Sequence, residues 1–317
     1  MSKPLLIAVC AGLLSLLAAL PAFKGLPGGL LLFYAASLPI YLTGFAYGLT
    51  AGTVATLSGF LVATVFGGFL LAGVFAVAHL LPAWTVVRQA MLQRQTPDGQ
   101  TEWMPAGSIL GALTGLAGGV LLIAGAVLAQ GQGLAAVTHQ ALTQVFNLIA
   151  PDLPTAARDA AVTMYAPYVP ASVGAVWMCT SVASAMTAQG LLARFGRNLR
   201  PTPSYLDLRL PEWVSWVFVA AALITLVAGG DAQYLARNMA LLTAVPFSLV
   251  GVTLVHRWAA QRRHPAATLI FFYFLFFIAA WVVFVMTAVL GALEQWAGIS
   301  HRLTGRGTGS GPADLNE

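Results

Sequence analysis

The stretch Gly107–Gly119 reads GSILGALTGLAGG and leads directly into the apolar run VLLIAGAVLA. Residues four apart lie on one face of a helix, so this stretch carries a stripe without side chains. In water each such glycine costs about 0.5–1 kcal/mol relative to alanine, whereas in lipid small residues let a second helix come close. The stretch therefore predicts a membrane helix over 106–129, packed through Gly107, Gly111, Gly115 and Gly119.

A second set of glycines, Gly44, Gly48 and Gly52, has the same spacing and predicts another packing face. We expect the 107–119 stripe to meet either this set or the predicted span over 171–193. A lipid-facing stripe is the alternative.

The composition indicates the same class of protein. Of 317 residues, 59% are hydrophobic and only 8% are charged, whereas soluble domains carry about 25% charged residues. The uncharged runs approach the ~20 residues that cross a bilayer as a helix. Strands of a barrel would alternate in polarity, and no such alternation is seen. The fold class predicted is an all-α, polytopic transmembrane helix bundle.

The apolar runs predict about nine spans, with eight as the alternative. They cover 5–22, 28–46, 49–66, 69–87, 106–129, 171–193, 213–228, 234–258 and 269–293. Gly67 and Gly68 leave no room for a loop between the third and fourth spans, which predicts a tight hairpin. Residues 1–302 then form one integral membrane domain, and the polar, glycine-rich 303–317 is predicted to be a disordered tail.

The longest segment outside the spans is 130–170. Its part 134–150 has apolar residues at helical spacing, with Gln, His and Asn between them, which predicts an interfacial helix along the bilayer surface. This segment either caps a cavity or simply links two spans.

Basic residues predict the orientation. With the amino terminus in the cytoplasm, ten of them lie inside and five outside; the five are Lys24, Arg158, Arg237, Arg302 and Arg306. This bias predicts a multi-pass protein of a bacterial cytoplasmic (inner) membrane. Nine spans place the tail outside, and an even number places it inside. Because the basic residues sit in short loops, they indicate orientation and not nucleic-acid binding.

Four polar side chains are candidates for contact with a substrate: His79, Tyr165, Arg237 and Asn238. Ionisable residues within a membrane are rare and often functional. The alternative for His79 is a neutral imidazole bonded to a neighbouring helix, and for Tyr165 an interfacial anchor.

Motifs for catalysis or cofactor binding are absent from the sequence. There is no Walker A, HExxH, GxSxG or CxxC pattern, and Cys10 and Cys179 lie apart in apolar runs. Asp and Glu are missing from the middle of every predicted span, which disfavours a carboxylate proton relay. We therefore expect no enzyme activity, no cofactor and no metal.

Two regions carry a resemblance to known families. LPIYLTGFAYGLTAGTVATLSGFLVATVFGG (38–68) resembles the first half of the substrate-binding subunits of energy-coupling-factor transporters. The ending is similar to that of the YybS-like family of bacterial membrane proteins: RLPEW, Asn238, LVGVTLVHRW, then LGALEQWAGISHR with Gly291, Glu294, Trp296 and Arg302. The transporter resemblance implies an outward-opening cavity and a small-residue face that docks a coupling subunit. Ala11, Ser15 and Ala19 match that face in part, with Ser15 at its central alanine.

Two functions remain open at this stage. The first is a small-molecule-binding membrane subunit whose transport is energised by partner proteins. The second is a non-transporting scaffold or assembly factor that acts through helix contacts with a membrane protein partner. A lipid-handling protein is a third possibility, which requires a lateral opening between spans.

Overall fold

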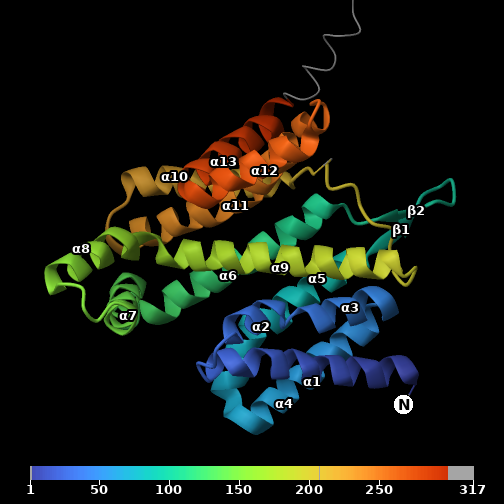
Figure 1. The fold of residues 1–317 in the computed structure, drawn as a ribbon, viewed down its shortest axis with the longest axis horizontal. Coiled ribbons are helices and arrows are strands. Elements are labelled where there is room, and N and C mark those ends of the chain that lie inside the picture. The colour runs from blue at the N-terminus through green and yellow to red at the C-terminus, as the bar shows by residue number, and fades with distance from the viewer. Residues whose placement is uncertain (1, 207, 299–317) are drawn as a thin grey trace, which may run out of the picture.

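The computed structural model describes residues 2–206 and 208–298 and is a bundle of helices with one small β-hairpin (Figure 1). The predicted all-α polytopic class is confirmed. Seven helical segments of this described part are long and apolar enough to cross a membrane, and two shorter apolar helices accompany them. The elements are α1 Lys3–Phe23, α2 Gly29–Ala35, α3 Leu38–Tyr47, α4 Leu49–Phe75, η1 Ala76–Leu80, α5 Leu81–Ala90, β1 Gln93–Gln95, β2 Thr101–Trp103, α6 Ala106–Leu128, α7 Leu134–Ile149, α8 Thr155–Tyr165, η2 Ala166–Tyr168, α9 Val169–Arg194, α10 Glu212–Val227, α11 Gly230–Ala260, α12 Pro265–Ile278 and α13 Ala280–Ala297.

The helices form two groups joined by α6 and α9. Helices α1–α5 pack together at one side, α10–α13 at the other, and α6 and α9 run between them (Figure 1). The buried core is continuous through this arrangement and is rich in alanine together with a few large side chains such as Tyr41, Phe75 and Phe247. Small residues at the contacts let membrane helices approach closely.

The segment Leu49–Ala90 is helical over 42 residues but is folded back on itself. A straight helix of that length would extend about 63 Å, roughly twice the hydrocarbon thickness of a bilayer. Gly68 breaks it with φ 71° and ψ −178°, a conformation that favours glycine. Beyond the turn, Trp84 Nε1 donates to Thr53 Oγ1 at 3.0 Å across the two arms. The hairpin predicted at Gly67–Gly68 is therefore present.

A proline in the second arm of this hairpin leaves a carbonyl group that another helix satisfies. Pro82 has no N–H to offer the carbonyl of Ala78, four residues earlier, and the preceding turn is a π-helix. Trp177 of α9 donates its Nε1 to this carbonyl at 3.0 Å and to that of Val77 at 3.1 Å. In lipid no water can take that role, so the irregular turn ties α9 to the hairpin.

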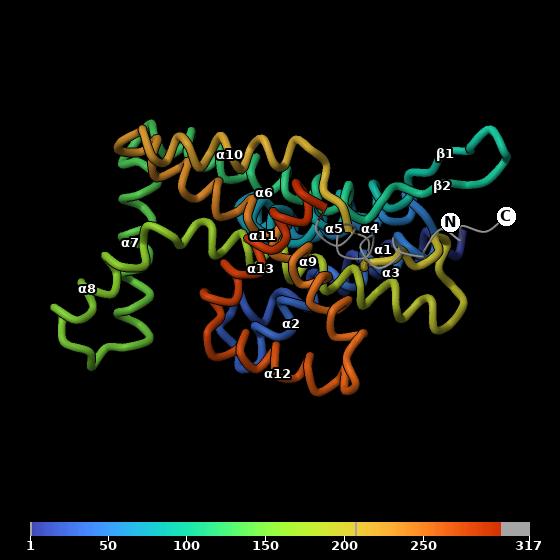
Figure 2. Tube along the Cα trace, turned by 90° about the horizontal axis from the view of Figure 1, so that it is seen from above, coloured from blue at the N-terminus to red at the C-terminus, as the bar shows by residue number. Residues whose placement is uncertain are grey.

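The predicted ninth span, 269–293, is wrong as a single helix. Ala279 has φ −123° and ψ 45°, and the chain changes direction there between α12 and α13 (Figure 2). Helix α13 packs tightly on α11, where Gly251 lies against the Thr287 carbonyl and Gly291 against that of Phe247. Ser248 and Thr287 add a buried hydroxyl contact of 2.7 Å.

The break at Ala279 changes the side of the bundle on which the last helix ends. Gln295 of α13 exchanges hydrogen bonds of 2.9–3.0 Å with the backbone of Leu210, next to the start of α10. Helix α13 thus ends on the side of the molecule where α9 and α11 also end (Figure 1). The side of the membrane on which the tail lies therefore cannot be taken from a count of nine spans. Arg302, Arg306 and the predicted tail 303–317 lie outside the described residues.

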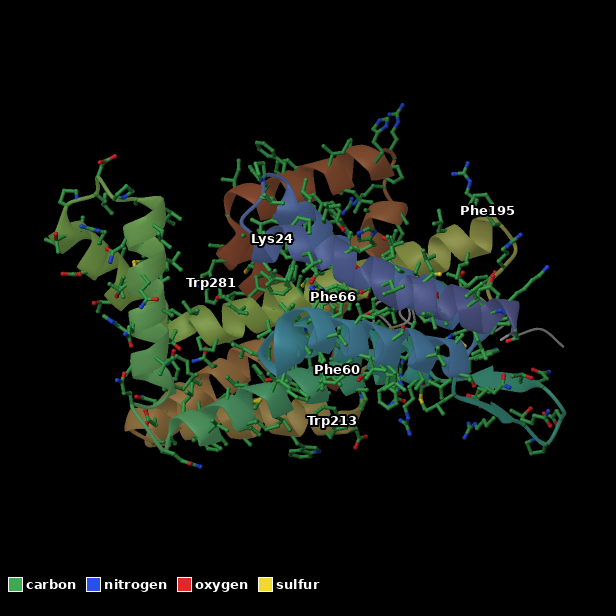
Figure 3. All side chains as sticks on the ribbon, turned by 90° about the horizontal axis from the view of Figure 1, so that it is seen from below. Lys24, Phe60, Phe66, Phe195, Trp213 and Trp281 are labelled. Carbon is green, nitrogen blue, oxygen red and sulfur yellow. The ribbon has the colours of Figure 1, made fainter. Side chains whose placement is uncertain are left out.

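One end of the bundle carries most of the positive charge, and we call it the basic end. It holds the chain's amino terminus, the β-hairpin and the carboxyl ends of α9 and α11 (Figures 1 and 2). Figure 3 shows Phe195 at the end of α9 and Lys24 at the turn after α1. Of the described basic residues, only Lys24, Arg158 and Arg237 lie away from the basic end; the others are Lys3, Arg88, Arg94, Arg194, Arg197, Arg200, Arg209, Arg257, Arg262 and Arg263.

Helices α7 and α8 project from the opposite end (Figure 2). Helix α7 spans Leu134–Ile149, close to the predicted 134–150, and of its side chains only Thr138 is buried. Leu148 and Ile149 are 81% and 72% exposed. A helix with exposed apolar residues fits the predicted position at the bilayer surface, which stays a prediction.

Candidate functional site

His79 lies in a closed cluster near the amino-terminal helices. Its Nδ1 is 3.0 Å from Ser37 Oγ, and its ring packs edge-on against Phe33 with centroids 4.3 Å apart. The side chain is only 4% exposed, and its Nε2 is buried without a hydrogen-bond partner among the described residues. His79 lines neither of the two cavities described below. The arrangement matches the alternative weighed for it, a histidine bonded to a neighbouring helix.

Asn238 satisfies backbone groups where α9 begins. Its Oδ1 accepts from the N–H of Ala171 at 2.9 Å, and its Nδ2 donates to the carbonyls of Pro167 and Tyr234 at 3.0 and 2.9 Å. These three hydrogen bonds all go to the backbone, and the residue is completely buried. This geometry describes a structural clamp between α11 and α9.

Tyr165 and Arg237 also line neither of these two cavities. Tyr165 ends α8 and is 52% exposed. Arg237 is half-buried, with its guanidinium 5.9 Å from the ring centre of Tyr168. None of the four predicted side chains lines the two cavities described below, and their contact with a substrate stays a prediction.

The 107–119 stripe meets a different partner from the two expected. Gly107 lies against the carbonyl of Arg209, Gly111 against the ring of Pro211, and Gly115 near Trp213. Figure 3 shows Trp213 beside α6 at the start of α10. The contact is with the segment that leads into α10, and neither with Gly44–Gly52 nor with α9. A Cβ at Gly119 would have no heavy atom within 4 Å, so that position lies outside the contact.

The second glycine set divides in the same way. A Cβ at Gly44 or Gly52 would press on the Val87 side chain, 2.5 and 2.9 Å away, so these two glycines accommodate α5. Gly48 has φ 88° and separates α3 from α4. It is a turn residue and not part of a helical stripe, because a positive φ favours glycine.

The predicted docking face on α1 is occupied within this chain. Ala11, Ser15 and Ala19 are 7%, 0% and 0% exposed. Ser15 Oγ donates to the carbonyl of Ala36 at 2.5 Å, which fixes α1 against the α2–α3 connection. A face buried in this way does not present itself to another subunit.

A cavity lies at the basic end, and we call it the Arg200 pocket. Its volume is about 690 Å³, within the range of about 300–1,000 Å³ usual for ligand sites. Apolar side chains from five helices make most of the wall. These helices are α5, α6, α9, α11 and α12, and Phe45 of α3 and residues of 200–206 and 208 complete the lining.

Arg200 is the buried cation of this wall, at 5% exposure. Its guanidinium donates to the carbonyl of Met104 at 2.6 Å and to that of Ala90, the last residue of α5, at 3.3 Å. Burial lowers the pKa of Arg200, although a guanidinium stays charged at neutral pH. Among the described residues no carboxylate lies within ion-pair distance of it; the ion pair found there joins Arg94 and Glu102.

The backbone of Arg200 is held as firmly as its side chain. Its carbonyl accepts from Gln189 Nε2 at 2.9 Å and from Asn198 Nδ2 at 2.7 Å. The N–H of Leu199 donates to the carbonyl of Phe45 at 3.1 Å. Pro201 and Pro203 further limit the backbone. Arg200 is therefore fixed in position before any ligand arrives.

A smaller, more polar cavity of about 500 Å³ adjoins the Arg200 pocket, and we call it the outer chamber. Four residues line both cavities: Ala106, Arg200, Pro203 and Ser204. Arg209, Ser108 and Trp103 also line the outer chamber. Tyr205, on the wall of the main pocket, has its pKa raised by burial and is neutral, so its hydroxyl remains a donor.

Sequence reasoning missed Arg200 because its loop was interpreted only as a positive-inside signal. The sequence carries a local sign of this role: in RNLRPTPSY, Arg200 directly precedes Pro201, and Pro203 follows two residues later, so the backbone is restricted there. Among the described residues no group of three or more His, Cys, Asp or Glu side chains is placed to hold a metal ion.

The fold and the pocket define a polytopic helical membrane protein with one cation at the side of an apolar cavity. The chain belongs to the DUF2232 family, described as predicted membrane proteins, whose sequence profile matches residues 12–293. Searches of curated proteins and of solved structures found no match.

Proposed function

We propose that this membrane protein binds a small molecule in the Arg200 pocket. The observation that carries the proposal is a buried, fixed arginine without an acidic partner among the described residues, beside an apolar cavity of about 690 Å³. A buried charge is costly unless it is paired. A ligand that brings an anionic group to Arg200 would therefore gain affinity, because the cost of burying the guanidinium has already been met in folding.

Binding, and not catalysis, is the role we propose. The chain then acts as a substrate-binding component whose transport step is energised by partner proteins, as the resemblance to energy-coupling-factor subunits implies. The buried face of α1 does not favour the docking mode of those subunits. A coupling partner would have to contact another surface.

The proposed location is a bacterial cytoplasmic membrane, with the amino terminus in the cytoplasm. Ten basic residues at one end against three described elsewhere support this orientation. The Arg200 pocket then opens near the cytoplasmic side, whereas the transporter resemblance implies an outward cavity.

A membrane scaffold is the second candidate function. The projecting α7–α8 pair favours it, because Leu148, Ile149 and Met164 expose apolar side chains away from the bundle. Such a surface suits either a membrane protein partner or the bilayer surface.

Mass spectrometry of small molecules and proteins retained after gentle detergent purification tests these roles. Ala185 of α9 lines the pocket, so Ala185→Phe fills it, whereas Ala183 is exposed on the same helix and Ala183→Phe is the matched control. We expect a retained small molecule that falls about tenfold, or 1.4 kcal/mol, only in Ala185→Phe. A protein partner retained equally by all variants, with no small molecule, would favour the scaffold.

A further inference from the structure

We infer that the Arg200 pocket and the outer chamber form one bipartite site for an anionic membrane lipid. The hydrocarbon chain lies in the apolar pocket and the acidic head group meets Arg200, where the two cavities join. This inference rests on the proposed function and specifies its ligand class.

The acidic head group is bound by Arg200 in this inference, because Arg200 is held at the junction of the two cavities. Its guanidinium uses one donor on each terminal nitrogen for a carbonyl, at 3.3 and 2.6 Å, and a guanidinium carries five N–H donors. Donors therefore remain for a planar or tetrahedral oxyanion, which arginine binds well. Ser204 lies on the shared wall and Tyr205 on that of the apolar pocket, so hydroxyl groups border the same place.

The hydrocarbon chain of the lipid contacts the walls of the apolar pocket in this inference. On α6 the lining extends from Ala106 to Leu113, which is about 10 Å along a helix at 1.5 Å per residue. Phe45, Leu110 and Leu113 on the inner wall are each at most 6% exposed. Such a wall offers few groups to recognise a polar metabolite but matches part of an alkyl chain.

Two residues that line the pocket are exposed on helices that carry many exposed apolar residues, which fits an opening toward the bilayer. Met186 of α9 and Tyr273 of α12 line the pocket and are 43% and 49% exposed. Met186 lies eight residues before the end of α9, about 12 Å inside that helix. Helix α12 has no buried residue at all. An opening between membrane-facing helices favours a ligand that arrives from the lipid phase over one that arrives from water.

Arg200 also has a purely structural interpretation. Its two acceptors are the last carbonyl of α5 and the carbonyl of Met104 before α6, so it ties the β-hairpin connection together. Arg200→Gln separates this role from ligand binding, because glutamine keeps an amide donor but loses the charge. Arg197→Gln is the matched control, because Arg197 is exposed in the same loop and this substitution changes the net charge by the same amount.

The experiment measures thermal unfolding of the full chain in dodecylmaltoside micelles, with phosphatidic acid, phosphatidylcholine or inorganic phosphate added. Phosphatidic acid raises the unfolding midpoint of the wild type and of Arg197→Gln. It has no such effect on Arg200→Gln or on Ala185→Phe, in which Arg200 is intact but the chain pocket is filled. Phosphatidylcholine and inorganic phosphate leave all midpoints unchanged.

The other results overturn the inference in distinguishable ways. If phosphatidylcholine raises the unfolding midpoint as much as phosphatidic acid does, the acidic head group plays no role. If inorganic phosphate alone gives the full increase in midpoint, the site binds a soluble anion. A lower midpoint for Arg200→Gln with an unchanged response to phosphatidic acid leaves Arg200 a structural residue only. A neutral compound retained through Ala185 overturns this inference but keeps the proposed function, whereas a protein that retains no small molecule and shifts with no lipid overturns both.

Discussion

The glycine stripe of α6 provides a graded test of packing, because its four positions meet four different surroundings. We replace each glycine by alanine, which adds a single Cβ. At Gly107 that atom would overlap the backbone carbonyl of Arg209, and at Gly111 it would lie 2.9 Å from the Pro211 ring. At Gly115 the nearest atom belongs to Trp213 at 3.4 Å, and at Gly119 there is none within 4 Å.

The expected losses of unfolding free energy follow from these contacts. Backbone cannot yield as a side chain can, so Gly107→Ala forces α6 away from the segment before α10 and costs about 2–3 kcal/mol. A proline ring shifts by a few tenths of an ångström, so Gly111→Ala costs about 1 kcal/mol. Gly115→Ala forms an ordinary contact and is close to neutral. Gly119→Ala is neutral or stabilising by up to about 1 kcal/mol through helix propensity.

The assay is unfolding in mixed dodecylmaltoside and SDS micelles, followed by tryptophan fluorescence, since Trp213 lies at this contact. Gly119→Ala is the internal control on the same helix. Equal stability of Gly107→Ala and Gly119→Ala would show that the stripe does not pack on the 209–213 segment. A loss confined to Gly119→Ala would place the packing face elsewhere on α6.

The remaining predictions concern single contacts and the topology. Trp177→Phe removes the indole donor to the Ala78 carbonyl in an apolar surrounding, and we expect it to lower the unfolding free energy by about 1–2 kcal/mol in the same assay. Trp216→Phe is the control, because Trp216 is 72% exposed; it leaves the unfolding free energy unchanged. Asn238→Leu removes three hydrogen bonds, two of them to the backbone where α9 begins, and costs about 1–3 kcal/mol. A neutral result would contradict the clamp. In a background without native cysteines, Cys substituted at Asp98 and at Ala297 reacts with an impermeant maleimide from the same side of the membrane, and reaction from opposite sides would refute the placement of α13.

Much of the fold could be predicted because its signals are local. The uncharged runs indicate the helices, and Gly67–Gly68 indicates a hairpin since too little chain remains for a loop. The break at Ala279 has no such signal: FFYFLFFIAAWVVF contains neither Gly nor Pro nor a charge. The helices α12 and α13 are separated by tertiary contacts, chiefly the close approach of Gly251 and Gly291 to backbone carbonyls on the opposite helix. Such a contact between distant residues cannot be predicted from one apolar run.

The candidate site was predicted less well, because a polar residue in a membrane helix has two possible roles that the sequence does not separate. A polar side chain in lipid is expensive, and it persists either because it serves a ligand or because it satisfies a backbone group. Asn238 satisfies the start of α9, and Ser15 the carbonyl of Ala36. Both are structural, and sequence cannot distinguish the two cases without knowing which carbonyl or N–H groups the fold leaves unpaired.

Arg200 presents the opposite problem, since a charge in a basic loop has an ordinary explanation that needs no site. The division of the last span is what connects it to a cavity. Because α12 turns away from α13, Tyr273 reaches His256 on α11, with Tyr273 Oη 2.8 Å from Nε2, and both side chains line the pocket. A single straight helix over 269–293 would not place Tyr273 in this position while keeping α13 on α11. The irregular feature that sequence did not predict therefore forms one side of the opening through which we infer that a lipid reaches Arg200.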